Sequence, residues 1–244
     1  MDILPLTVIV FIILAAIAMV LTLTWPRIVS NHEAVQIEKY TNKNFVNDFF
    51  GDQIYVINLK SRPDRLKNTT QELNKMGIKF QVMEAVDSTH PDVPKVPLAP
   101  RVAGCFLSHN KVLKALLAST AEWCLIFEDD IIFPEGVNQA TFEAAMMTAL
   151  KYNPEAVLFG SCYTDHPKDY KFSLSVQGTQ CAHAYAVNRK GAEMRLRIPI
   201  EKRKRACDFY EQDEWKVIAV TTDLDHLDRE KHQTGLVFQS VSRQ

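Results

Sequence analysis

The chain has 244 residues, a formal net charge of -1 and 47% hydrophobic residues, which suits one globular domain with an appended segment. A domain of about 200 residues buries a core large enough to fold without disulfides or metals. The balanced charge argues against nucleic acid as the main partner, because phosphate backbones are bound by concentrated basic surface. The one basic run, Lys202 to Arg205, is interpreted as a solvated loop, with contact to phosphate or an anionic surface as the alternative.

The first segment, Ile3 to Trp25, carries no charged residue. At about 1.5 Å per residue, a helix of this length covers a hydrocarbon core of roughly 30 Å. The alternative is a cleaved signal peptide, since Ala16-Ile17-Ala18 resembles a cleavage site. No Lys or Arg precedes the apolar run, and the run continues past that site. We therefore predict an uncleaved transmembrane anchor over residues 1–26.

The anchor predicts a single-pass membrane protein, located in an endomembrane if the source is eukaryotic or viral. Its orientation is only weakly indicated, because Arg27 alone favours a cytosolic domain. Residues 27–51 are polar without strong periodicity and are predicted to form a stem. The remaining residues, 52–244, are predicted to form the folded domain.

Strands and helices alternate along this domain, which predicts an α/β fold with a mixed sheet covered on both faces. Strands are expected from short β-branched runs and helices from apolar residues spaced three and four apart. The expected strands are 53–59, 79–86, 122–127, 156–159, 182–187, 216–221 and 236–239. The expected helices are 63–76, ended by Gly77, then 103–119, 137–150 and 189–196.

Three adjacent acids, Glu128, Asp129 and Asp130, follow the apolar strand Trp123 to Phe127. In α/β sheets, ligands bind outside the carboxyl ends of the strands, so this is where a site is expected. Crowded carboxylates repel one another, and a divalent cation such as Mg²⁺ or Mn²⁺ relieves the conflict. An extended backbone would project Glu128 and Asp130 to one side and Asp129 to the other. An exposed acidic turn is the alternative.

Several spaced motifs together resemble glycosyltransferase family 25, which includes bacterial lipooligosaccharide galactosyltransferases and collagen galactosyltransferases. In order along the chain they are Tyr55-Val-Ile-Asn-Leu-Lys-Ser-Arg-Pro-Asp-Arg65, Glu84-Ala-Val-Asp87, Gly104-Cys-Phe-Leu-Ser-His109, Leu125-Ile-Phe-Glu-Asp-Asp130 and Ala184-Tyr-Ala-Val-Asn-Arg-Lys-Gly-Ala192. The resemblance extends from Gln53 to the C-terminus. It implies a single GT-A-like, Rossmann-type nucleotide-sugar-binding domain that transfers a sugar, usually galactose from UDP-galactose, with inversion.

The resemblance also implies roles for individual residues. The metal ion would be held by Asp130 and Glu128, and the acceptor's proton would be taken by Asp208, with Glu211 or Asp213 as alternatives. The residues expected at the donor and cofactor site are Asn58, Arg62, Arg65, Asp87, Ser108, His109, Glu128 and Asp129. The arginines suit diphosphate oxygens. His109, Arg62 and Arg65 also have a purely structural interpretation, as a core histidine and as solvated charges.

The predicted partners are a nucleotide-sugar donor and a glycan, glycolipid or glycoprotein acceptor. One departure from the resembled family is Arg101-Val102, where members often carry Gly-Glu. This departure keeps a second hypothesis open, a catalytically inactive, membrane-anchored relative that acts in binding or adhesion. A metal-dependent phosphohydrolase is a weaker hypothesis, because no second set of metal ligands is evident.

The five cysteines show no metal-type spacing. Cys105 and Cys124 lie in apolar contexts and are interpreted as small core residues. The remaining three, Cys162, Cys181 and Cys207, are the candidates for one disulfide if the domain faces an oxidising lumen.

Overall fold

The computed structural model describes residues 33–34, 37, 39–162, 172–175, 182–203, 217–222 and 233–239. The predicted anchor, residues 1–26, lies outside these ranges. Among the described residues, no helix has both the length and the apolar character needed to cross a membrane.

The core of the domain is an eight-stranded mixed sheet with the order β1-β8-β10-β6-β9-β4-β2-β3. Its strands are β1 (Glu33–Ala34), β2 (Ile54–Asn58), β3 (Gln81–Glu84), β4 (Trp123–Glu128), β6 (Ala156–Leu158), β8 (Phe172–Ser175), β9 (Ala184–Asn188) and β10 (Val217–Thr222). Strand β2 pairs in parallel with β3 on one side and with β4 on the other, whereas β9 runs antiparallel to both β4 and β6. The predicted mixed α/β fold is confirmed, and it fits a Rossmann-like domain.

Two short ribbons flank the sheet. In one, β5 (Ile131–Ile132) pairs with β12 (Phe238–Gln239), and in the other, β7 (Gly160–Cys162) pairs with β11 (Gln233–Gly235). The first ribbon joins the segment that follows the acidic motif to the last described segment of the chain, and the second joins the segment that follows β6 to the same last segment. The sequence predicted one strand over 236–239 and neither of these pairings, because strands of two or three residues give almost no periodic signal.

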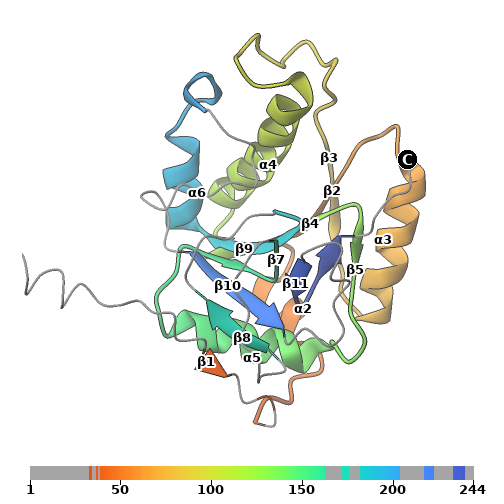
Figure 1. Ribbon diagram of the computed structural model, residues 1–244, viewed down its shortest axis with the longest axis vertical. Coiled ribbons are helices and arrows are strands. Elements are labelled where there is room, and N and C mark those ends of the chain that lie inside the picture. The colour runs from red at the N-terminus through yellow and green to blue at the C-terminus, as the bar shows by residue number, and fades with distance from the viewer. Residues whose placement is uncertain are drawn as a thin grey trace, which may run out of the picture.

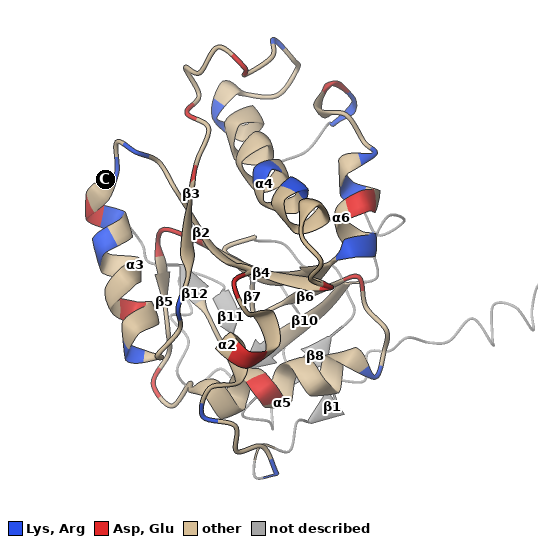
Figure 2. Ribbon diagram, turned by 180° about the vertical axis from the view of Figure 1, so that it is seen from behind, with Lys and Arg blue, Asp and Glu red and all other residues tan. Residues whose placement is uncertain are grey.

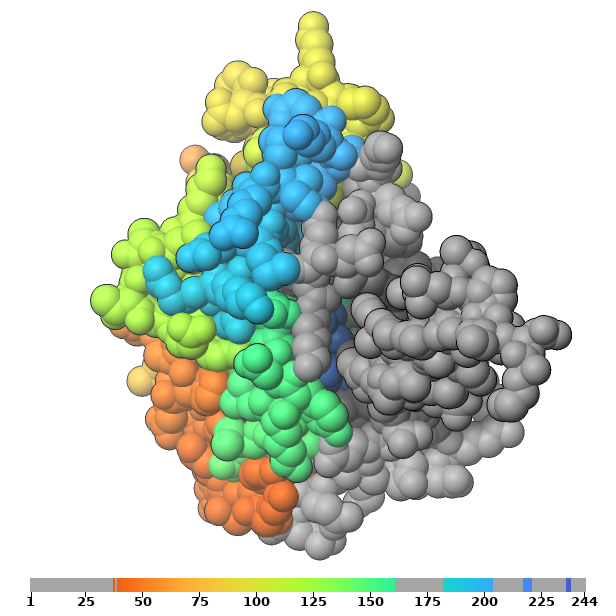
Figure 3. All heavy atoms as spheres, turned by 90° about the vertical axis from the view of Figure 1, so that its left-hand side faces the viewer, coloured from red at the N-terminus to blue at the C-terminus, as the bar shows by residue number. Residues whose placement is uncertain are grey.

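The helices form two layers around the sheet (Figure 1). They are α2 (Phe45–Phe50), α3 (Pro63–Lys75), α4 (Pro100–Ala118), α5 (Gln139–Leu150) and α6 (Arg189–Leu196), followed by a 3-10 turn at Ile200–Lys202. The apolar residues of α4 and α6 pack on one face of the sheet, and those of α2, α3 and α5 pack on the other. The space-filling view shows α6, in blue, lying against α4 (Figure 3).

Strand β2 shows why the strands of this sheet appear in the sequence as unbroken apolar runs. All five of its residues are buried, with Tyr55 and Ile57 in the cluster under α4 and Ile54 and Val56 in the cluster over α5. A strand covered on both faces has no polar side to alternate with. The strand β2 and its neighbour β4 are therefore covered by helices on both faces of the sheet.

Helix α2 lies within the stretch expected to be a polar stem. Its residues Phe45, Val46 and Phe50 are buried in the core beside α5, and the Val46 amide donates to the side chain of Gln139. The folded domain therefore begins before residue 52. The helix is only six residues long, so its apolar pattern is too short to stand out in the sequence. The anchor and the rest of the stem stay predictions.

Candidate functional site

The acidic motif lies at the carboxyl end of β4, as predicted, but its side chains do not alternate as on an extended strand. Strand β4 ends at Glu128, and Asp129 and Asp130 form a turn. Both aspartates are nearly buried, each with 8% of its surface exposed. The turn directs both carboxylates to the same partner, Arg65, so the expected pairing of Glu128 with Asp130 on one side is wrong.

Arg65 joins the two aspartates. Its Nη1 atom lies 3.2 Å from Asp129 Oδ1 and 3.2 Å from Asp130 Oδ2. Asn58, at the end of the parallel neighbour β2, donates from Nδ2 to the other oxygen of Asp129 at 2.6 Å and to the Arg62 carbonyl at 3.0 Å. The register of β2 and β4 brings these strand ends together, since Ile57 pairs with Glu128. Four of the predicted site residues thus form one network: Asn58, Arg65, Asp129 and Asp130.

Helix α3 places Arg65 where it can reach the acids. Pro63 starts the helix, where its missing N–H costs no hydrogen bond, and Gly77 follows its end with a φ of 66°. Both signs of charge occur along α3, whereas α4 carries only Lys and Arg (Figure 2). A guanidinium between two carboxylates offsets the desolvation that each would otherwise suffer in the buried turn.

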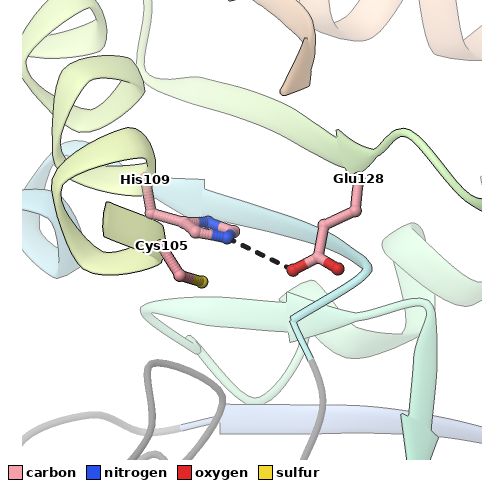
Figure 4. A group of neighbouring side chains, drawn as sticks. All are labelled: Cys105, His109 and Glu128. Carbon is pink, nitrogen blue, oxygen red and sulfur yellow. Dashed lines mark ion pairs between the residues drawn. The ribbon is translucent and has the colours of Figure 1, made fainter. Parts of the chain in front are cut away.

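The side chain of Glu128 points away from the two aspartates that contact Arg65 and towards α4. Its Oε1 atom lies 3.4 Å from His109 Nε2, and the dashed line in Figure 4 marks this ion pair. The other ring nitrogen, Nδ1, lies 2.9 Å from the Tyr185 hydroxyl, and the two rings stack with centroids 5.7 Å apart. His109 and Tyr185 are both buried. The 3.4 Å contact is an ion-pair distance, and His109 Nε2 makes no hydrogen bond of good geometry.

The pKa of Glu128 lies below its usual value. Burial is the largest single influence and would raise it, but the contact with His109, together with nearby His183 and Arg65, outweighs burial. The Glu128 amide also donates to the His183 carbonyl at 2.8 Å. The carboxylate is therefore held ionised at neutral pH, with a quarter of its side chain still exposed to a ligand.

His183 was not among the residues expected at the site. It is buried, its Nε2 lies 2.8 Å from the Val237 carbonyl oxygen, and burial holds the pKa of its ring below the usual value. Tyr185, two residues later, was interpreted as a packing residue and proves to be the partner of His109. Polar residues spaced two apart in an otherwise small and apolar run, Ala182-His-Ala-Tyr185, were the available signal.

Cys105, His109 and Glu128 form a group whose possible ligand atoms all lie within 4.8 Å of one another (Figure 4). However, Cys105 is disulfide-bonded, so its sulfur is not a thiolate and does not complete a metal site. The prediction that Cys105 is a simple core cysteine is therefore wrong. Among the described side chains Cys124 is free and buried, as predicted. The other cysteines lie outside the described side chains.

The acidic motif was also expected to hold Mg²⁺ or Mn²⁺. In the described part of the chain, the three carboxylates do not form a closed cage, since Asp129 and Asp130 face Arg65 while Glu128 faces His109. Such cations are commonly held by one or two carboxylates, with waters and substrate phosphates as the other ligands. Asp130 and Glu128 both supply the hard oxygen ligands that such cations prefer, although in the structure the two carboxylates face different partners.

The other predicted residues have local partners. Arg62 pairs with Asp64 at 2.8 Å, near the surface, and this contact lowers the pKa of Asp64 to about 2. Asp87 accepts two hydrogen bonds from Thr89, which lower the pKa of the Asp87 carboxyl. Ser108 accepts from the Val86 amide at 2.8 Å and donates to the Gly104 carbonyl.

Ser108 thus ties α4 to the segment that leads to Asp87, which is a structural contact. The predicted base Asp208 and its alternatives Glu211 and Asp213 lie outside the described residues. Their roles stay predictions.

Comparison with known proteins gives the family. The model described as "Glycosyltransferase family 25 (LPS biosynthesis protein)" matches residues 51–210. A Haemophilus influenzae protein is 27% identical over 167 residues, which are 59% of this chain and 56% of that protein. Human "Procollagen galactosyltransferase 2" is 31% identical over 100 residues, 34% of this chain and 16% of its own length. The mouse "Inactive glycosyltransferase 25 family member 3" is 28% identical over 128 residues, 45% of this chain and 21% of its own length.

The chain thus spans about half of the Haemophilus protein and about a fifth or less of the two mammalian ones. The matched residues begin directly after α2 and run through the acidic motif and past α6, so they include every side chain of the network around Arg65 and His109. Because the family model covers more than half of the sequence, this chain belongs to glycosyltransferase family 25.

Proposed function

We propose that the chain moves a hexose, with galactose as the first candidate, from a UDP-sugar to a hydroxyl of a glycan, glycolipid or glycoprotein. Family membership supports a transferase, and one relative is named a galactosyltransferase. The observation that carries the proposal is the buried Asp129–Asp130 turn, bridged by Arg65 at the carboxyl end of β4. That is the edge at which sheets of this kind bind ligands.

The described residues suit the binding of a nucleotide diphosphate. Arg65 supplies a planar cation that pairs well with phosphate oxygens, and Asn58 fixes the carboxylate of Asp129 beside it. Asp130 and Glu128 would hold Mn²⁺ or Mg²⁺. When bound, such an ion stabilises the charge that develops on the departing diphosphate.

Inversion at the anomeric carbon requires a base that takes the proton of the attacking hydroxyl. Asp208 is our candidate for this role. The anchor predicted over residues 1–26 would keep the domain near glycoproteins or glycolipids that pass along a membrane. The order of events is then donor binding at the acidic turn, followed by attack of the acceptor hydroxyl opposite the leaving group.

The test is transfer or slow hydrolysis of UDP-sugars by the purified full chain in the presence of Mn²⁺. One donor should be turned over, and Asp130→Asn should lower kcat/KM by about a hundred-fold or more, as for other groups that stabilise developing charge. The matched control is Asp64→Asn, which removes a carboxylate that pairs with Arg62 near the surface. This control should keep the wild-type rate.

A chain that turns over no donor, with or without metal and acceptor, contradicts the proposal. The second candidate function, an inactive relative that serves as a binding protein, is then favoured. It draws support from Val102, which stands where family members often carry Glu, and from the relative named inactive. Val102 lies in the first turn of α4, seven residues and therefore two turns before His109.

A further inference from the structure

We infer that Tyr185 and His109 form a buried brace that fixes the orientation of the Glu128 carboxylate, which makes His109 a positioning residue. The inference rests on the proposed sugar transfer, because it concerns a side chain of the same site. The brace joins three elements that are far apart in sequence: helix α4, strand β4 and strand β9.

The contacts fix which ring nitrogen of His109 faces each partner. His109 Nε2 lies 3.4 Å from Glu128 Oε1, at an ion-pair distance. The other ring nitrogen, Nδ1, lies 2.9 Å from the Tyr185 hydroxyl, within hydrogen-bond distance. The tyrosine hydroxyl thus holds the ring so that Nε2 faces the carboxylate of Glu128.

Burial makes the brace rigid. The His109 side chain is 1% exposed, and its ring stacks on Tyr185, which is itself buried between β9 and α4. Glu128 by contrast is 25% exposed and has a long side chain. Ordering such a side chain when a ligand binds costs conformational entropy, and contacts that are already in place reduce that cost. The brace is one such contact.

The strand register supports the same role. The Glu128 amide donates to the His183 carbonyl, and β4 pairs with β9 so that Ile126 lies opposite Tyr185. Glu128 lies two residues after Ile126 on β4, and its side chain emerges beside the His109 ring that Tyr185 contacts. Backbone and side chain are therefore fixed from the same strand. A small misplacement of a reacting or binding group costs about a hundred-fold in rate.

Two substitutions of His109 separate positioning from packing. His109→Gln keeps an amide donor near the place of Nε2, whereas His109→Asn keeps one near Nδ1 only. Both remove the ring, and Asn, which is one methylene shorter, leaves the larger void, so the midpoint of thermal unfolding is measured for each variant and should fall somewhat further in His109→Asn. We expect His109→Asn to lower kcat/KM for the UDP-sugar at least about ten-fold more than His109→Gln does. The assay uses the full chain with Mn²⁺.

A readout without turnover accompanies the assay. The dissociation constant of UDP, measured by calorimetry in Mn²⁺, should rise more in His109→Asn than in His109→Gln. Tyr185→Phe removes only the hydroxyl that holds His109 Nδ1 and keeps the stacked ring. It should lower kcat/KM by several-fold, and it remains informative if both His109 variants fail to fold.

The outcomes are distinct. Equal losses in the two His109 variants, or Tyr185→Phe with wild-type turnover and wild-type UDP affinity, overturn the brace while the proposed function stands. A wild-type chain that neither binds UDP nor transfers any sugar overturns the proposed function, and the brace falls with it.

Discussion

At the scale of single residues, Arg65 is the side chain on which the acidic turn depends. Two aspartates with only 8% of their surfaces exposed share its Nη1 atom, and Asn58 satisfies one further oxygen. Removing one partner of a buried charge pair costs more than the pair contributes, because the remaining charge stays desolvated. The guanidinium therefore stabilises the folded chain as well as the site.

Arg65→Gln tests this dependence. We expect the free energy of unfolding in urea to fall by about 1–3 kcal/mol, since two carboxylates lose their cation in a turn that is mostly buried. Combining it with Asp129→Asn should restore part of the loss. The matched control is Arg62→Gln, whose ion pair with Asp64 is exposed and should matter little. Equal losses for the two arginines would contradict the argument.

The buried ring of His183 makes stability depend on pH. Its pKa is lowered by burial, so the unfolded chain takes up a proton at a higher pH than the folded chain does. This contribution to stability is complete above about pH 6.5 and is lost as the pH falls from there through the lowered value. The pKa of Glu128 is also lowered, so protonation of this carboxylate removes further stability in more acid solution.

His183→Gln should therefore flatten the fall in urea midpoint between about pH 7 and about pH 5. Glutamine keeps a donor for the Val237 carbonyl but does not titrate. The control is His90→Gln, which replaces a histidine whose ring is largely exposed. If the urea midpoint falls with pH as steeply in His183→Gln as in the wild type, the pH dependence comes from other groups.

At the scale of elements, the close approach of α4 to the segment after β3 sets the place of His109. A Cβ atom added at Gly104 would lie 2.6 Å from the Val86 carbonyl oxygen, and Ser108 Oγ accepts from the Val86 amide. The glycine and the serine of the Gly104-to-His109 motif are thus explained by contact between helix and backbone. The same motif ends with the histidine of the brace.

Gly104→Ala should consequently destabilise the protein, although alanine is the better helix former by about 1 kcal/mol. The expected loss is about 1–3 kcal/mol in urea unfolding, the usual cost of overpacking. The control is Gly77→Ala at the end of α3, where nothing lies within 4 Å and only the positive φ opposes a side chain. Gly104→Ala as stable as the wild type would show that α4 can shift without cost.

The sequence predicted the long elements well, because their signals are periodic. The helix 189–196 agrees with α6 at both ends, and the expected start of α4 was three residues late because Pro100, an ordinary first helical residue, was taken as loop. The acidic turn was correctly placed after β4. Its partners were predicted only in part, since contacts such as Glu128 with His109 depend on register across elements, which periodicity does not encode.

At the scale of the whole molecule, the domain depends on residues that precede the family motifs. Phe45, Val46 and Phe50 of α2 are buried against α5, and the amide of Asn42 donates to Glu143 of that helix. Burying side chains of this size stabilises a fold by about 1.5–3 kcal/mol each. Their sum approaches the entire stability of an ordinary domain, about 5–15 kcal/mol.

Two truncations test this conclusion. A chain that starts at residue 39 should unfold cooperatively on heating, followed by circular dichroism. A chain that starts at residue 52 keeps all the motifs but lacks α2, and we expect it to aggregate or to unfold at a much lower temperature. Similar unfolding midpoints for the two chains would mean that α2 only covers the core and does not stabilise it.

The covalent bond of Cys105 has a consequence for where the chain can work. This sulfur lies on α4 one turn before His109, so a cross-link holds the helix that carries the brace. Glutathione in the cytosol reduces such bonds, whereas the endoplasmic reticulum, the periplasm and the cell exterior preserve them. With the predicted anchor in a membrane, we therefore expect the domain to lie on the side away from the cytosol. The disulfide would then indicate the orientation more strongly than the single charge of Arg27 does.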